Sequence, residues 1–315
     1  MGAIFGGRMP SPHTYLPGGF TATPTAERIA GFQTQLNWLL AFIRDVYFSD
    51  VETLARVYSD YRSIGAGPRN LLAYGVFDLD DTGLSKFLRT GYAEAGSARP
   101  VLSLDDRNIT ESVTHSWYND STNGLTPASG QTVPAYPKAD AYSWLKAPRL
   151  AGKPFEVGAL ARMWVNGDYR DGISVIDRHA ARARETLKVA QAMSDWLSQL
   201  QPGQPVYNGF RPLNGVGVGL TEAPRGALGH WVDIRQGKIA HYQVITPTCW
   251  NASPRDSQHV PGPLEQALVG TPVTDAVRPI EVLRVIHSFD PCLSCAVHIL
   301  RPRGKPVVVL AHHEH

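Results

Sequence analysis

The sequence predicts an α+β protein in which long packed helices accompany short antiparallel strands. Two long stretches, roughly residues 24–48 and 171–200, repeat apolar residues at helical spacing. From residue 205 onward, short β-like segments follow one another with turns between them. Because helices and antiparallel hairpins occur in mixed order, we expect an α+β body.

The first long helix follows an irregular start. About two dozen N-terminal residues are rich in Gly, Pro, Ser and Thr, which predicts a loop. Thr23-Pro24 then resembles a helix start, because a cap hydroxyl is followed by proline in the first turn. The core-facing positions of this helix are predicted to be Ile29, Phe32, Leu36, Leu39, Leu40 and Ile43. Shorter helices are expected at residues 51–62 and 82–92.

The remaining elements are read in the same way. Residues 100–170 predict irregular structure with short strands, because Pro, Gly and Tyr are frequent there. Pro202-Gly203 ends the second long helix. Residues 227–234 and 239–245 predict two strands joined by a Gly-Lys turn. Helices are expected at 262–270 and 276–287, and a last β-like run at 306–310.

Composition excludes several classes of protein. A formal charge of +2 gives no electrostatic reason to expect nucleic acid as a partner. The sequence contains no run of about 18 apolar residues, so it predicts no transmembrane helix. The first residues do not resemble a secretory signal. The three cysteines, Cys249, Cys292 and Cys295, are too few to predict a disulfide framework.

The strongest chemical signal is the segment from Ser288 to His298, which contains Cys292-Leu-Ser-Cys295. Two thiolates three residues apart on a turn can point at one soft metal, and His298 can reach the same ion or a second one. A lone Cys-x-x-Cys pair is also compatible with a buried pair, with half of a zinc site or with a thioredoxin-like redox pair. A zinc site needs about two more ligands, and the sequence has no second pair.

The complete string Asp290-Pro-Cys-x-x-Cys-x-x-His298 is more specific than its cysteines. It resembles the C-terminal signature of nickel–iron hydrogenase large subunits, and the resemblance extends over essentially the whole chain. The expected fold is therefore part of the hydrogenase large-subunit fold. The other similar segments are Phe5–Pro10, Glu111–Tyr118, Lys146–Arg149, Glu156–Arg162, Arg178–Arg182, Glu222–Trp231 and Tyr242–Asp256.

This resemblance implies a bimetallic centre. Cys292 would be a terminal ligand of nickel, and Cys295 would bridge nickel to an iron that carries cyanide and carbon monoxide. Thr248 matches the hydroxyl that donates to one cyanide, and the loop containing Pro224 packs on the other.

The resemblance also implies the residues that act on H₂. Arg225 would lie over the open metal position, as a candidate base or as a charge that helps a nearby base. Asp290 would pair with Arg225 and fix its orientation, because a carboxylate and a guanidinium are both planar. His298 and the backbone oxygen of Val244 match ligands of a nearby magnesium (or iron) ion.

Other candidate residues have simpler interpretations. Cys249 is expected to be a buried small apolar residue rather than a ligand. His115, His179 and His230 are expected to be core histidines with satisfied hydrogen bonds. Residues 215–219, Gly-Val-Gly-Val-Gly, do not predict a nucleotide-binding loop, because no clear strand precedes them and no helix follows.

The family's other two cysteine ligands have no counterpart here. The resemblance therefore implies that the chain splits H₂ only when an N-terminal half carrying the other pair completes the centre. Three alternatives remain open: an inactive product of a truncated or split gene, an H₂ sensor, or a zinc-binding module that uses Cys292, Cys295 and His298.

Further partners follow from the same resemblance. They are a small subunit with iron–sulfur clusters, a maturation chaperone and an endopeptidase. Residues 1–298 would be the C-terminal portion of the large subunit, and the endopeptidase would remove 299–315. Export with the small subunit would place the enzyme in the periplasm or at the membrane, with the cytoplasm as the alternative.

Overall fold

A computed structural model describes residues 6, 13–97, 99–209, 214–292, 298–299 and 307–308. Its α-helices are α1 (Ala26–Phe42), α2 (Phe48–Val57), α3 (Ala159–Asn166), α4 (Val175–Ser198), α5 (Pro247–Asn251), α6 (Pro263–Leu268) and α7 (Ile280–Ser288). Short 3-10 helices cover Ser59–Arg62, Asp106–Asn108 and Asp120–Thr122. The strands are β1 (Tyr15–Leu16), β2 (Gly19–Phe20), β3 (Leu71–Ala73), β4 (Val76–Asp78), β5 (Lys86–Leu88), β6 (Gly91–Ala93), β7 (Ile109–Ser112), β8 (Ala147–Leu150), β9 (Val206–Tyr207), β10 (Gly215–Ala223), β11 (Gly226–Arg235), β12 (Lys238–Ile245), β13 (His298–Ile299) and β14 (Val307–Val308).

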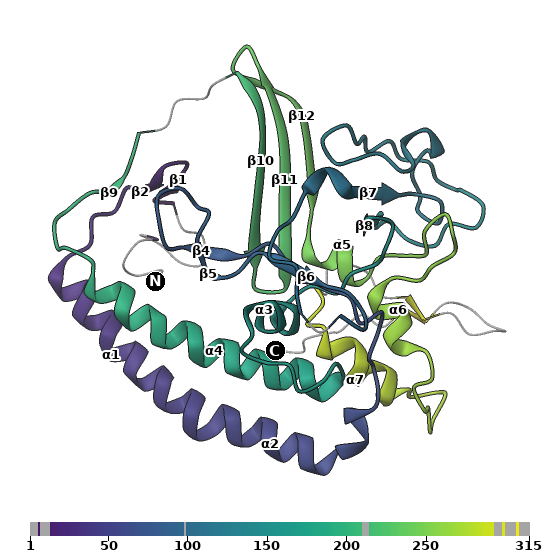
Figure 1. The fold of residues 1–315 in the computed structure, drawn as a ribbon, viewed down its shortest axis with the longest axis horizontal. Helices are drawn as coiled ribbons and strands as arrows, with labels where there is room; N and C mark the ends of the chain where they lie inside the picture. Colours follow the sequence, from purple (N-terminus) through teal and green to yellow (C-terminus); the bar gives the residue numbers. More distant parts are fainter. Residues whose placement is uncertain are drawn as a thin grey trace.

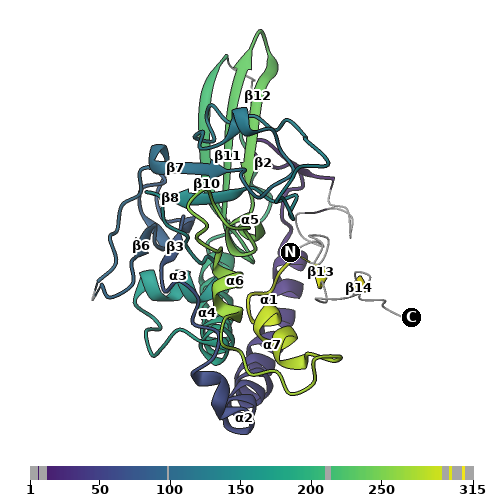
Figure 2. The same ribbon diagram turned by 90° about the vertical axis from the view of Figure 1, so that its right-hand side faces the viewer.

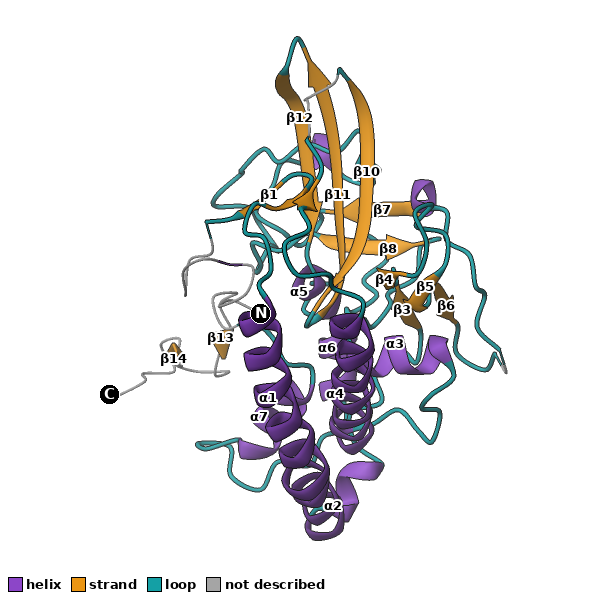
Figure 3. Cartoon of the chain, turned by 90° about the vertical axis from the view of Figure 1, so that its left-hand side faces the viewer, coloured by secondary structure: helices purple, strands orange, loops and turns teal. Residues whose placement is uncertain are grey.

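The predicted α+β class is confirmed. Long helices run side by side along one edge of the molecule, and a tall antiparallel sheet of β10, β11 and β12 stands over them (Figure 1). The view from the left-hand side shows α1 and α4 lying next to each other below that sheet (Figure 3). Short two-stranded pairs, β3–β6, β4–β5 and β7–β8, flank it.

The first two predicted helices form one continuous rod. A π-helical segment, Ile43–Tyr47, joins α1 to α2 without a break. The cap is Thr25, whose side chain accepts a hydrogen bond from the Arg28 N–H, and not Thr23 as expected. Leu36 and Ile43 pack against Ala190 of α4, so the helical spacing predicted the buried face of the rod. Leu39, also predicted to face the core, is exposed.

The helix expected at residues 82–92 is wrong, because this segment forms β5 and β6. Lys86 and Leu88 pair with Asp78 and Val76, and β6 pairs with β3. Pairing with the strands β4 and β3 overrides the local preference of these short segments. The helix α3, in the region expected to be irregular, was not predicted.

The second half follows the prediction more closely. The Ser174 side chain caps α4, and β11 and β12 form a hairpin. Residues 215–219 lie in β10, so a nucleotide-binding loop is excluded. The helix α6 falls inside the range expected for it, and α7 ends one residue beyond its expected range. A buried cluster around Trp231, Trp250, Phe155 and Tyr74 lies at the base of the tall sheet. Figure 2 shows β7 and β8 crossing beside this sheet.

Candidate active site

The turn that carries Pro224 and Arg225 is the lower end of a hairpin. Strands β10 and β11 pair in register up to Ala223 and Gly226, which leaves Pro224-Arg225 as a two-residue loop. Gly226 has a φ of +136°, and a Cβ there would lie 2.7 Å from the Gly158 nitrogen. The backbones of the turn and of residues 157–158 are therefore in direct contact, and only glycine permits this approach.

The second component is the segment after α7. The helix ends at Ser288, and Asp290 has a φ of +52°, in the left-handed region that few non-glycine residues adopt. The Asp290 N–H donates to the His287 carbonyl oxygen at 3.0 Å. This conformation turns the chain away from the axis of α7. Residues 289–292, which we call the exit segment, carry Asp290 and Cys292.

Two contacts hold the exit segment, one from the hairpin turn and one from α5. Arg225 Nε lies 3.6 Å from Asp290 Oδ1, and both side chains are 44% exposed. The expected ion pair is present, but as one long contact rather than a bidentate pair. The Cys292 N–H donates to Thr248 Oγ1 at 3.4 Å. Thr248 is buried near the start of α5, so it reaches the exit segment from below the tall sheet.

Two arginines of α4 hold the exit segment in place. Arg178 is buried, makes a two-point ion pair with Glu156 at 2.7 and 2.8 Å, and lies over the Phe289 ring. Arg182 donates to the Ser288 carbonyl oxygen at 2.8 Å. Burial lowers the pKa of Arg182, and the charge of Asp290 opposes that shift. Both arginines belong to the family segment Arg178–Arg182, for which the resemblance implied no role.

A small polar cavity lies between the hairpin turn and the exit segment. Its lining includes Arg178, Arg182, Arg225, Pro224 and Phe289. Glu156 also lines the cavity and pairs with Arg178, so the positive charge that favours an anion, such as a thiolate, comes from Arg182 and Arg225. On the other side of Pro224 a larger cavity of about 380 Å³ is lined mainly by apolar residues of α1, α4 and β4.

The expected magnesium ligand Val244 lies in β12, opposite His230 of β11. Its neighbour Gln243 donates to the buried carboxylate of Glu111 at 2.5 Å, and Lys146 Nζ lies 3.6 Å from the same carboxylate. Burial raises the pKa of Glu111, and the charge of Lys146 opposes this. Glu111 and Lys146 are the first residues of two family segments, so the sequence located this buried charged cluster without indicating that its members meet.

The other predicted residues fall into two groups. Cys249 packs against the Trp231 cluster and burial raises the pKa of its thiol, as expected for a residue that is not a ligand. His115 is buried, and its ring is hydrogen-bonded to the Asp140 carbonyl oxygen. His230, which was expected in the core, is only partly buried, and its ring is hydrogen-bonded to the Tyr242 hydroxyl. Cys295 lies outside the described residues, as does the His298 side chain, although His298 pairs with Val308 in a short strand pair.

Within the described residues, no group of three His, Cys, Asp or Glu side chains could hold a metal ion alone. Cys292 lies three residues after Phe289, which lines the polar cavity, and a thiol at this place fits one ligand of a metal centre. None of the described helices combines the length and apolar character that a membrane crossing requires.

A hairpin arginine and a cysteine-bearing exit segment thus meet in this α+β fold. The family profile described as nickel-dependent hydrogenase matches residues 1–172 and 165–298. The chain belongs to this family, and its fold is that of the hydrogenase large subunit.

Individual relatives agree. The periplasmic NiFeSe hydrogenase large subunit of Desulfomicrobium baculatum is 39% identical over 95% of this chain and 63% of the relative. The uptake hydrogenase large subunit of Bradyrhizobium diazoefficiens is 34% identical over 96% of this chain and 62% of its own length. A solved NiFeSe hydrogenase from Dm. baculatum superposes with a TM-score of 0.88 at 39% identity, covering 94% of this chain and 65% of that one. The chain thus spans less than two thirds of these relatives.

Proposed function

We propose that this chain is the C-terminal portion of a nickel–iron hydrogenase large subunit and takes part in the reversible cleavage of H₂, in the direction of H₂ uptake. One observation carries the proposal. Arg225 and Thr248, 23 positions apart in different elements, both contact the segment 290–292 that bears Cys292. The alternative of an H₂ sensor uses the same residues and differs in the partners that receive the signal.

The residues fit the implied metal pair in part. Cys292 and Cys295 would hold the nickel, and Cys295 would also hold the iron. The metal pair, with cyanide and carbon monoxide on iron, would supply the Lewis acidity and redox chemistry that separate H₂ into protons and electrons. Cys249 packs in the core, so the three cysteines of the sequence leave two thiolates for the metals.

The protein's own groups would then handle charge and protons. Arg225 would stabilise developing negative charge or receive a proton, and Asp290 would orient its guanidinium. Thr248 already accepts a hydrogen bond from Cys292 N–H, and a hydroxyl that accepts can still donate its own hydrogen to a cyanide. Pro224 would pack on the other cyanide. His298 and the Val244 carbonyl oxygen would bind magnesium or iron near the Glu111–Lys146 cluster.

The partners follow from the family. We propose that the N-terminal half of the large subunit, which carries the other Cys-x-x-Cys pair in this family, completes the centre. Electrons would leave through a small subunit with iron–sulfur clusters. One relative is named a periplasmic hydrogenase large subunit. This supports a location of the assembled enzyme in the periplasm or at the membrane surface rather than in the cytoplasm.

We further propose that a chaperone and an endopeptidase mature the chain, with cleavage between His298 and Ile299. The family match ends at residue 298, which supports a removable extension over 299–315. The cut would be visible by mass spectrometry of the chain isolated from the assembled enzyme.

The decisive test is co-expression with the N-terminal half and the small subunit. We expect about one nickel per complex and H₂-dependent dye reduction. Cys292→Ser should abolish both, whereas Cys249→Ala, the matched control, should retain nickel. An assembled complex that keeps its nickel and activity after Cys292→Ser would refute the proposal. Stoichiometric zinc on the chain without its partners would instead favour the zinc module.

A further inference from the structure

Arg162 of α3 is a buried arginine that the predicted site does not use. The residue is only 3% exposed, and all five N–H groups of its guanidinium have acceptors. Two of the acceptors belong to Glu185 of α4, at 2.5 and 2.7 Å, and one to Glu222 of β10, at 2.8 Å. Burial alone lowers the pKa of Arg162, but the hydrogen bonds and charges of these two carboxylates raise it above its ordinary value.

The other two acceptors are backbone groups of the hairpin turn. Arg162 donates to the Ala223 carbonyl oxygen at 3.1 Å and to the Pro224 carbonyl oxygen at 3.0 Å. These carbonyls belong to the two residues that precede Arg225. The two hydrogen bonds from Arg162 therefore fix the peptide plane that leads into Arg225.

The same helix contacts the turn a second time. Gly158, one helical turn before Arg162, caps α3, and its own Cβ position would lie 3.1 Å from the Arg225 carbonyl oxygen. The turn is thus held on both sides of the Arg225 Cα. The Gly158 backbone contacts the Arg225 carbonyl oxygen, and the Arg162 guanidinium binds the carbonyl oxygens of the two preceding residues. The ion pair with Glu185 anchors this guanidinium to the long helix α4, which also carries Arg178 and Arg182.

The structure assigns Arg162 as a positioning residue for Arg225: it holds the hairpin turn at a fixed distance from the exit segment of Cys292. This rests on the proposed hydrogenase function. The fork geometry is essential, because lysine has three N–H groups and no planar arrangement, so it cannot serve two carboxylates and two carbonyls together. Small displacements of a group that acts on a substrate can cost up to about a hundredfold in rate.

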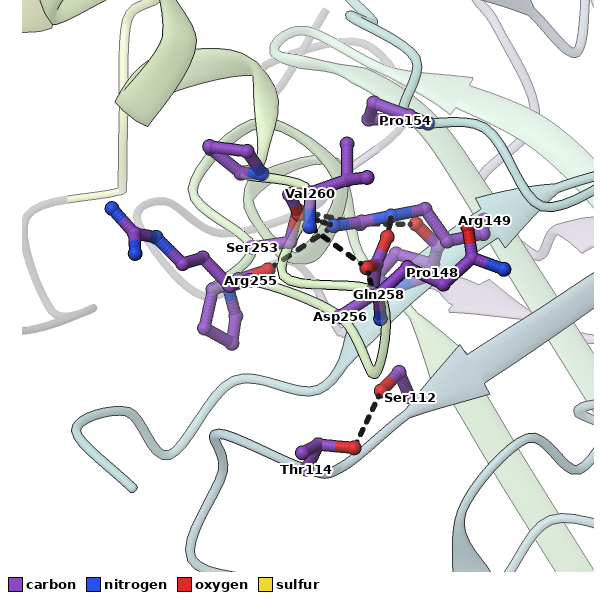
Figure 4. Close-up of polar contacts among 12 residues, drawn as sticks. Ser112, Thr114, Pro148, Arg149, Pro154, Ser253, Arg255, Asp256, Gln258 and Val260 are labelled. Atoms are coloured by element: carbon purple, nitrogen blue, oxygen red, sulfur yellow. Dashed lines mark hydrogen bonds and ion pairs between the residues drawn. The ribbon is translucent and has the colours of Figure 1, made fainter. Parts of the chain in front are cut away.

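A matched control exists in the same protein. Arg149 of β8 is also 3% exposed, and its five hydrogen bonds reach Asp256, Ser253 and the carbonyl oxygens of three further residues, Pro148, Pro254 and Val260 (Figure 4). It fixes the loop 253–260 and does not contact the hairpin turn. Arg149→Lys therefore reports the general cost of replacing a buried arginine fork.

The experiment compares Arg162→Lys with Arg149→Lys in the assembled complex, at a temperature where both remain folded. We expect Arg162→Lys to lower kcat for H₂ oxidation per bound nickel by about tenfold or more, with the KM for H₂ changed less than about twofold. Hydrogen–deuterium exchange in residues 220–228 should accelerate in Arg162→Lys only. Arg149→Lys should leave both readouts within about twofold of the wild type.

Equal losses in the two lysine variants, or faster exchange in 220–228 with unchanged kcat, would overturn the inference. If Arg162→Lys does not assemble, Glu185→Gln replaces it under the same criteria, because it removes the charge that anchors the Arg162 guanidinium to α4 and so frees it to leave the turn. A wild-type complex without H₂ activity would count against the proposed function, whereas an active wild type with an equally active Arg162→Lys variant would count against the role of Arg162 alone.

Discussion

Thr248 Oγ1 accepts a hydrogen bond from the Cys292 backbone N–H across 44 residues of sequence. The contact ties the first turn of α5 to the segment that leaves α7. Because the donor is a backbone group, the contact fixes the path of the chain at Cys292 without using its thiol.

Replacing Thr248 should weaken this link. Thr248→Val keeps the shape but removes the acceptor oxygen, and we expect the free energy of unfolding to fall by about 1 kcal/mol, since the 3.4 Å contact is long. Thr248→Ser keeps the oxygen and should retain most of the stability of that contact. Chemical denaturation of both variants checks this. Equal unfolding midpoints for Val and wild type would show that the contact contributes nothing.

The hairpin turn offers a second prediction. Gly226→Ala should destabilise the protein by about 1–3 kcal/mol, because its Cβ would lie 2.6 Å from the Val157 side chain at a φ of +136°. Gly219→Ala, in the same strand pair, is the control, since nothing lies within 4 Å of its Cβ position. Thermal unfolding distinguishes them. A Gly226→Ala variant as stable as Gly219→Ala would contradict the close backbone approach.

The buried pair of Glu156 and Arg178 should be costly to break. Glu156→Gln leaves a buried guanidinium without its counter-charge, and we expect a loss of about 3–5 kcal/mol. Asp275→Asn removes the charged partner of Arg278, whose side chain is 88% exposed, and should cost much less, because solvent screens this pair. Denaturant titrations of the two variants measure the difference. Similar losses in both would refute the importance of burial.

His179 predicts a pH dependence of stability. Burial, and then the charges of Arg182 and Arg178, lower its pKa from 6.5 to about 4. The unfolded chain therefore binds more protons than the folded chain between pH 6.5 and 4, so the free energy of unfolding falls as the pH drops through that window. The loss should reach at most about 3 kcal/mol. His179→Gln should flatten this part of the stability profile, and an unchanged slope would refute the assignment.

Arg225 is the side chain on which the proposed chemistry depends most. In the assembled enzyme, Arg225→Lys should lower kcat for H₂ oxidation by about a hundredfold while nickel content stays constant. Arg235→Lys, at the other end of β11 and paired with Asp233 at the surface, should behave like the wild type. Nickel analysis and dye-reduction assays on the same samples provide the comparison. Full activity in Arg225→Lys would exclude a role for its guanidinium.

Much of this architecture followed from local patterns. The helical repeat located α1 and α4, and the turn signals located β11 and β12, because one buried face imposes a regular spacing on the sequence. The resemblance singled out Arg225, Asp290, Thr248 and Cys292, and two of their mutual contacts are present. Residues 82–92 could not be read correctly, because strands β5 and β6 depend on partners elsewhere in the chain.

The sequence by itself determined the class of fold, the cysteine pair and the order of the site segments, since these depend on residue type and spacing. Only the tertiary structure decided that Arg162 holds the Pro224 carbonyl, that Arg182 holds Ser288, and that Asp290 adopts a left-handed conformation. Those relationships join residues from separate elements. Their hydrogen bonds and ion pairs depend on distances that form only when the helices and the tall sheet have packed.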